Sequence, residues 1–174
     1  VMTRKSLIIT ATILALSVFA GVETDAQTQI ISPDGTYLFA ERDTCTLFMD
    51  VYEPAKGSKT SIDGISRPTI IFMFGGGFVG GTRDDPDYHK WFRQMTDEGY
   101  RIISIDYRLG LKGSTKVGVA QVNVLDKAIH MAVEDLFSAT SYIIDNAEQL
   151  SVDPDNIVIS GSSAGAISVM QAEY

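Results

Sequence analysis

The pattern of hydrophobic and polar positions predicts two β-strands near the start of the chain, over Thr36–Ala40 and Thr46–Tyr52. In the second run, Leu47, Met49 and Val51 alternate with Phe48, Asp50 and Tyr52, which is typical of a strand with one buried face. The short segment Glu41–Thr44 between them predicts a hairpin turn. Pro54 ends the second run, and the polar segment Ala55–Arg67 after it predicts a loop.

Three later runs are apolar on both faces, as strands inside a parallel sheet are. These runs are Pro68–Phe74, Arg101–Tyr107 and Asn156–Ser160. The segments between and after them instead carry apolar residues at helical spacing. We therefore expect helices over Tyr88–Glu98, over Val122–Leu150 as one or two helices, and over Ala164–Glu173.

The predicted order is a hairpin followed by strand, helix, strand, helix, strand and helix. Such alternation implies an α/β fold, with a mostly parallel sheet, helices on both faces and an antiparallel hairpin at its start. Ligands of these sheets bind beyond the carboxyl ends of the strands. We expect the loop at Gly75, the region of Asp106 and Ser163 to share that rim.

The segment Gly161–Gly165 reads Gly-Ser-Ser-Ala-Gly, a G-x-S-x-G motif between a predicted strand and a predicted helix. A tight turn there lifts the Ser163 hydroxyl above the sheet, and side chains two positions away on either side would collide. The following helix directs its N-terminus at the site, which favours developing negative charge. Ser163 is therefore predicted to be a nucleophile, and the Ala164 N–H an oxyanion donor. The alternative is an ordinary glycine-rich turn.

The segment Phe74–Phe78 reads Phe-Gly-Gly-Gly-Phe at the end of another predicted strand. Three glycines let the backbone approach a substrate closely. We expect the N–H groups of Gly76 and Gly77 to join Ala164 in an oxyanion hole. A plain flexible loop is one alternative. A phosphate-binding loop is another, but the strand before it follows a hairpin and the acidic partner of such a motif is ambiguous.

Four segments, in this order and spacing, resemble the α/β-hydrolase carboxylesterases, both the hormone-sensitive-lipase-like and the type B carboxylesterase groups. The likeness extends over Tyr37–Tyr174, and its segments are Leu47–Pro54, Phe74–Phe78, Asp106–Gly110 and Gly161–Gly165. The resemblance implies an α/β-hydrolase fold with Ser163 as nucleophile and Gly76 and Gly77 as oxyanion donors. It also implies that the segment Asp106-Tyr107-Arg108, with Asp106 and Arg108 in particular, braces the site from behind, and that secreted relatives act on acetylated or feruloylated plant polysaccharides.

Phe74 departs from this pattern, because many members of the family have a histidine there that orients the glycine loop. Some type B relatives carry an aromatic residue at this position. The departure raises the question of what supports the loop in this chain.

The base that a serine nucleophile needs is missing from the expected place. In this fold an acid and then a histidine follow the serine, whereas His89 and His130 both precede Ser163. Each histidine lies in a predicted helix, where a packing or surface role is expected. We therefore expect residues 27–174 to be the N-terminal portion of a longer hydrolase domain, with the acid and histidine beyond Tyr174 and little turnover by this portion alone.

The first residues are predicted to be a secretory signal peptide over residues 1–26. Arg4 and Lys5 precede the apolar stretch Leu7–Ala20, and small residues then mark a cleavage site. The apolar stretch is shorter than the ~20 residues of a spanning helix. This order predicts a secreted or periplasmic protein without stable membrane insertion after cleavage. Cys45 is the single cysteine, so no internal disulfide is expected.

Composition and charge also indicate which classes of partner and cofactor to expect. The formal charge is −8 and no run of Lys and Arg offsets it, so nucleic acid is not expected as a partner. One Cys and two distant His do not compose a zinc site, and no cofactor is expected. The predicted substrate is a small-molecule or carbohydrate ester.

Two other functions remain open. One is a serine peptidase of the same fold, although such enzymes usually have a second glycine where this chain has Ala166. The other is a non-catalytic binding member, although such members usually lose the serine. We also hypothesise that the loop Gly110–Gly118, with Val119 and Val122 after it, overhangs the pocket and selects acyl groups; an ordinary surface loop is the alternative.

Overall fold

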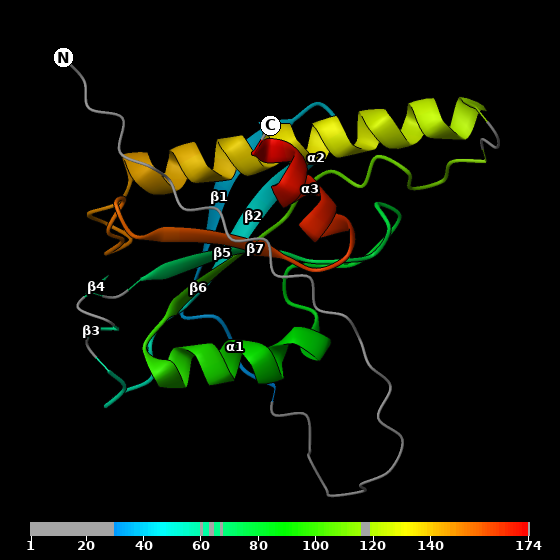
Figure 1. Ribbon diagram of the computed structural model, residues 1–174. Helices are drawn as coiled ribbons and strands as arrows, with labels where there is room; N and C mark the ends of the chain where they lie inside the picture. The colour runs from blue at the N-terminus through cyan, green and yellow to red at the C-terminus, as the bar shows by residue number, and fades with distance from the viewer. Residues whose placement is uncertain (1–29, 60, 63–64, 67, 116–118, 174) are drawn as a thin grey trace, which may run out of the picture.

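The computed structural model describes residues 30–59, 61–62, 65–66, 68–115 and 119–173 (Figure 1). The predicted signal peptide, with its cleavage site, lies outside these residues. Among the described helices, none is both long and apolar enough to cross a bilayer.

A five-stranded mixed sheet forms the centre of the molecule, in the order β1-β2-β6-β5-β7. The antiparallel pair β1–β2 is the predicted hairpin, and β5, β6 and β7 run parallel to one another. Strand β2 joins the two parts by pairing antiparallel with β6. The strands are β1 (Gly35–Arg42), β2 (Cys45–Tyr52), β5 (Thr69–Met73), β6 (Arg101–Ile105) and β7 (Ile157–Gly161).

Helices cover both faces of this sheet, as the alternating pattern predicts. Helix α1 (Pro86–Glu98) lies on one face, and α2 (Val119–Asp145) and α3 (Ala164–Ala172) lie on the other (Figure 1). This arrangement confirms the α/β-hydrolase type of fold. The region predicted to hold one or two helices contains one long helix, α2.

The core explains why the central strands are apolar on both faces. Every residue of β5 and β6 is buried. On the α1 face, the Phe72 ring packs against Trp91 and Phe92 at centroid distances of 5.3 Å. On the other face, Ile71 and Ile103 are completely buried. Burying each such isoleucine contributes about 1.5–3 kcal/mol relative to leaving it exposed.

The ends of α1 are set by its sequence. The Asp85 carboxylate accepts a hydrogen bond from the Asp87 N–H at 3.0 Å, and Pro86 occupies the first helical position, where its missing N–H costs nothing. Gly99 ends the helix with φ 102°. Its left-handed conformation favours glycine, and an added Cβ there would lie 2.4 Å from the Lys59 carbonyl oxygen.

The prediction of a continuous loop over residues 55–67 is wrong. Within it, β3 (Ser61–Ile62) and β4 (Ile65–Ser66) pair antiparallel as a small separate hairpin. Strands of two residues are too short to show an alternating pattern. The Asp-Gly sequence between them is a hairpin signal that could have revealed it.

The register of the parallel strands brings their carboxyl ends to one rim. Met73 pairs with Ile105 on one side and with Gly161 on the other. The loop at Gly75, Asp106 and Ser163 each follow one of these strand ends, so they lie at the rim where the pattern predicts them. The loop hypothesis for residues 110–118 stays untested, since residues 116–118 lie outside the described chain.

Candidate active site

Ser163 occupies a strained position between β7 and α3. Its backbone angles are φ 48° and ψ −114°, and its side chain is exposed. A non-glycine residue with this positive φ is uncommon and costs of the order of 1–3 kcal/mol. The turn therefore holds the Ser163 side chain out at the rim of the sheet, as the motif predicts.

Neither flanking glycine of the motif could carry a side chain without clashing with the backbone nearby. A Cβ added to Gly165 would lie 2.2 Å from the Met73 carbonyl oxygen, and one added to Gly161 would lie 2.5 Å from the carbonyl carbon of Gly165. Real Cβ atoms do not approach backbone so closely. The absence of side chains thus lets the first turn of α3 sit directly on the end of β5.

The glycine loop, Gly75–Gly81, lies against the serine turn. An added Cβ on the buried Gly75 would stand 3.1 Å from the Ser163 Cβ. The loop folds back on itself, because the N–H groups of Val79 and Gly80 both donate to the Gly76 carbonyl. Gly76 and Gly77 have φ values of 130° and 62°, which favour glycine. The fold thus brings the two motifs into contact.

Three backbone N–H groups near the serine are candidates for binding an oxygen. Within the described part of the chain, those of Gly76, Gly77 and Ala164 donate to no protein acceptor. Gly76 and Gly77 are exposed, and Ala164 begins α3, whose N-terminus carries partial positive charge. The three predicted oxyanion donors are thus without a protein acceptor among the described residues, and their role stays a prediction.

Phe74, the residue that departs from the family pattern, is held by an aromatic neighbour. Its ring stacks on Tyr107 with centroids 4.4 Å apart. The Tyr107 hydroxyl donates to the Phe74 carbonyl at 2.8 Å, and the Gly75 N–H donates to the Tyr88 hydroxyl at 2.9 Å. Tyr107 lies in the segment Asp106–Gly110, which carries the family resemblance, whereas sequence reasoning missed Tyr88, which belongs to none of the motifs.

Asp106 lies at the rim but is engaged with the backbone and an arginine. Its carboxylate accepts hydrogen bonds from the Phe48 N–H at 3.1 Å and from Arg83 Nη1 at 2.9 Å. Burial raises the pKa of Asp106, and these two donors oppose that rise. Arg83 also forms an ion pair with the buried Asp50 at 2.8 Å. Asp106 therefore connects β2 to the loop before α1.

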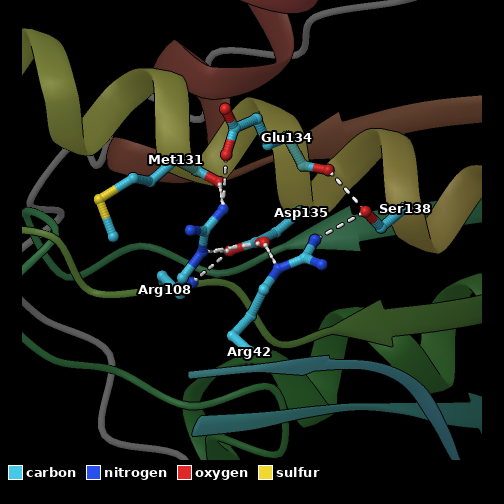
Figure 2. A network of polar contacts seen from close by, with 6 residues as sticks. All are labelled: Arg42, Arg108, Met131, Glu134, Asp135 and Ser138. Carbon is cyan, nitrogen blue, oxygen red and sulfur yellow. Dashed lines mark hydrogen bonds and ion pairs between the residues drawn. The ribbon is translucent and has the colours of Figure 1, made fainter. Parts of the chain in front are cut away.

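Arg108 belongs to a network of polar contacts with α2 (Figure 2). Its Nε and its backbone N–H both bond to the completely buried Asp135, at 2.9 and 2.8 Å. Arg42 of β1 reaches the other oxygen of that carboxylate at 3.0 Å and Ser138 at 2.7 Å. Glu134 pairs with Arg108 at 2.8 Å from the exposed side. The network joins β1, α2 and the segment after β6.

Neither histidine contacts Ser163 among the described residues. His89 is buried against Tyr52 and Phe92, and its Nδ1 accepts a hydrogen bond from the Ile31 N–H at 3.2 Å. His130 is exposed on α2, with Nδ1 2.8 Å from the carbonyl oxygen of the residue one turn earlier. Both positions agree with packing and surface roles.

A pocket of about 340 Å³ adjoins the glycine loop. Its lining includes Phe74, Gly81, Leu109, Met131 and the half-buried Cys45. Across the described ranges, no group of three or more His, Cys, Asp or Glu side chains is placed to hold a metal ion.

Comparison with known proteins extends this picture. The BD-FAE family model matches residues 49–173. The chain is 27% identical over 125 residues to gut esterase 1 of Caenorhabditis elegans, covering 72% of this chain and 20% of that protein. It is 33% identical over 110 residues to phenmedipham hydrolase of Pseudarthrobacter oxydans, covering 63% of this chain and 20% of that protein. The chain thus spans about a fifth of the length of these curated relatives.

Among solved structures, the apo form of Thermogutta terrifontis esterase 2 superposes with a TM-score of 0.55 at 27% identity. The match covers 75% of this chain and 42% of that one. The fold and the paired glycine and serine motifs define an α/β-hydrolase of the type found in esterases. The chain belongs to the BD-FAE family.

Proposed function

We propose that the protein is a serine esterase that hydrolyses carboxylic esters through an acyl-Ser163 intermediate. One observation carries the proposal: an exposed serine on a strained turn abuts a glycine loop, beside three N–H groups that have no acceptor within the described chain. Esterases among its relatives and structural neighbours support the same class of reaction.

In the proposed reaction, the Ser163 oxygen attacks the ester carbonyl carbon and its proton passes to a base. The carbonyl oxygen becomes an anion that the N–H groups of Gly76, Gly77 and Ala164 stabilise. Losing one such donor typically costs about 2.7–4 kcal/mol of transition-state stabilisation. The alcohol then leaves with a proton, and water attacks the acyl-serine to release the acid and restore the hydroxyl.

The base belongs to a part of the protein outside the described residues. In this fold the acid and the histidine follow the nucleophile in the chain, and the two described histidines are engaged elsewhere. We assign Asp106 and Arg108 to support of the site, because each bonds to neighbouring elements.

For the substrate, we propose acyl or feruloyl esters of plant polysaccharides, on the strength of the family resemblance. Relatives named phenmedipham hydrolase and fumonisin B1 esterase support small-molecule esters as a wider class. Comparing turnover of feruloylated and acetylated oligosaccharides with that of simple p-nitrophenyl esters tests the assignment, and equal kcat/KM values on all three would contradict it.

The experiment that tests the mechanism replaces Ser163 in the complete gene product. We expect Ser163→Ala to abolish both ester hydrolysis and covalent labelling by a fluorophosphonate, because the attacking oxygen is gone. Ser162→Ala removes a neighbouring hydroxyl and should keep the labelling. Hydrolysis by Ser163→Ala at the wild-type rate would remove Ser163 from the mechanism.

The same labelling separates the other two functions. A non-catalytic binding protein would not react with the fluorophosphonate. A peptidase would react, but it would cleave peptide substrates in preference to esters. Ala166 in place of a second glycine favours the esterase.

We further propose that the protein is exported, from the charged and apolar pattern of residues 1–26. N-terminal sequencing of the protein recovered from medium or periplasm should begin near residue 27. Recovery of the intact N-terminus in the cytosol would contradict export.

A further inference from the structure

The peptide that joins Phe74 to Gly75 is held at both of its polar groups. Its carbonyl accepts a hydrogen bond from the Tyr107 hydroxyl at 2.8 Å, and its N–H donates to the Tyr88 hydroxyl at 2.9 Å. The C=O and N–H of a trans peptide point in opposite directions. The two hydroxyls therefore form hydrogen bonds at opposite edges of one peptide plane.

Each tyrosine is itself fixed by ring packing. The ring of the buried Tyr107 stacks on the Phe74 ring, with centroids 4.4 Å apart and an interplanar angle of 26°. The Tyr88 ring meets Phe72 edge to face at 4.8 Å. Tyr107 follows β6 and Tyr88 belongs to α1, so two separate elements locate the same peptide.

This peptide leads directly into the proposed oxyanion donors. Gly75 abuts Ser163, and the position of its missing Cβ lies 3.1 Å from the Ser163 Cβ and 3.2 Å from the Tyr88 hydroxyl oxygen. A rotation of the peptide plane would carry Gly76 and Gly77 with it. Phe74 offers no polar side-chain atom that could set the loop's orientation.

We propose that Tyr88 and Tyr107 are positioning residues that together fix the plane of the Phe74–Gly75 peptide, and so aim the N–H groups of Gly76 and Gly77 at the oxygen of a substrate on Ser163. The inference rests on the proposed esterase function, since the donors matter only if an oxyanion forms. Burial, with a further contribution from Tyr88, raises the pKa of Tyr107 above its usual value. Its hydroxyl therefore keeps the proton that it donates.

The test compares Tyr88→Phe, Tyr107→Phe and the double variant in the complete gene product. Each single change removes one hydroxyl and keeps the ring. We expect kcat to fall at least about tenfold with KM within about twofold, because the donors act on the transition state. The double variant should lose less than the product of the two single losses, because both hydroxyls hold the same peptide.

Tyr52→Phe is the matched control. The Tyr52 hydroxyl is also buried against α1, but it has no hydrogen-bond partner in the described structure. Its removal should leave kcat within about twofold of wild type. Three results would overturn the proposal. They are an unchanged kcat in Tyr88→Phe or in Tyr107→Phe, a loss of kcat in the double variant equal to the product of the two single losses, and an equal loss of kcat in Tyr52→Phe.

A readout without activity separates this inference from the proposed function. Hydrogen exchange of the Gly75 amide should be slow in the wild type and accelerate at least about tenfold in Tyr88→Phe, because its acceptor is gone. Unchanged exchange of the Gly75 amide in Tyr88→Phe overturns the positioning role of the tyrosines, even if Ser163→Ala abolishes hydrolysis. A wild-type protein that hydrolyses no ester contradicts the proposed function, whereas accelerated exchange in Tyr88→Phe still supports the positioning role.

Discussion

Gly165 shows how one residue couples the two motifs of the site. It lies in the first turn of α3, directly against the end of β5, where an added Cβ would lie 2.2 Å from the Met73 oxygen and 2.6 Å from the Phe74 oxygen. Both neighbours are backbone atoms, so they cannot swing aside as a flexible side chain does. The spacing between Ser163 and the glycine loop therefore depends on this residue having no side chain.

Gly165→Ala should destabilise the fold. We expect a loss of about 1–3 kcal/mol or more in the free energy of unfolding, because α3 and β5 must move apart. Urea unfolding measures the change. Gly80→Ala is the control: an added Cβ there meets nothing within 4 Å, and the expected change is within about 0.5 kcal/mol. Equal urea midpoints for the two variants would show that the close approach of α3 to β5 at Gly165 does not determine stability.

At the scale of elements, the Asp135 network ties together parts that lie far apart in the sequence (Figure 2). Asp135 is completely buried on α2 and receives Arg42 from β1 and Arg108 from the segment after β6. A buried carboxylate needs such partners, since its burial is otherwise strongly unfavourable. The network thus fixes α2 against the sheet next to Tyr107.

Asp135→Asn should lower the free energy of unfolding by about 3–5 kcal/mol, because it leaves two guanidinium groups without their shared charge. Chemical denaturation measures the effect. Glu134→Gln changes the exposed partner of the same Arg108 and should cost at most about 1 kcal/mol. Similar losses for both variants would mean that burial of Asp135 is not the deciding factor.

At the scale of the whole molecule, the described sheet ends at β7, and the exposed Ile167 and Met170 lie on the neighbouring α3. The opposite edge is β1, the first strand of the antiparallel pair β1–β2. Ser163 therefore follows an edge strand of the described sheet.

The 174-residue chain assayed alone should hydrolyse p-nitrophenyl acetate no faster than its own Ser163→Ala form. A serine hydroxyl without a base is a poor nucleophile, and His89 and His130 are engaged elsewhere. A steady-state assay of both forms decides this. Turnover that Ser163→Ala removes would place a base within the 174 residues.

Features with a local signature were predictable from the sequence. Two strand-like runs joined by a short segment predicted the hairpin β1–β2, continuous apolar runs predicted β5, β6 and β7, and glycine spacing located the turn at Ser163. These patterns reflect forces that act on neighbouring residues. The predicted roles of Ser163, the oxyanion donors, Asp106 and Arg108 remain predictions until the variants are measured.

Contacts between distant residues could not be predicted in this way. Arg42 meets Asp135, and Tyr88 meets the Gly75 N–H across the rim of the sheet. Such pairs depend on how elements pack, and no spacing within one segment encodes them. The short hairpin of β3 and β4 was missed for another reason, since two residues per strand give no period to detect.

The parallel register of β5 and β7 has a consequence for the order in which the molecule folds. Thr69 pairs with Ile157 and Met73 with Gly161, so closing this ladder brings together residues that are far apart in the sequence, at a cost in loop-closure entropy. The serine turn and the glycine loop meet only when the ladder closes. A nascent or partly unfolded chain therefore has the residues of the candidate site without its geometry.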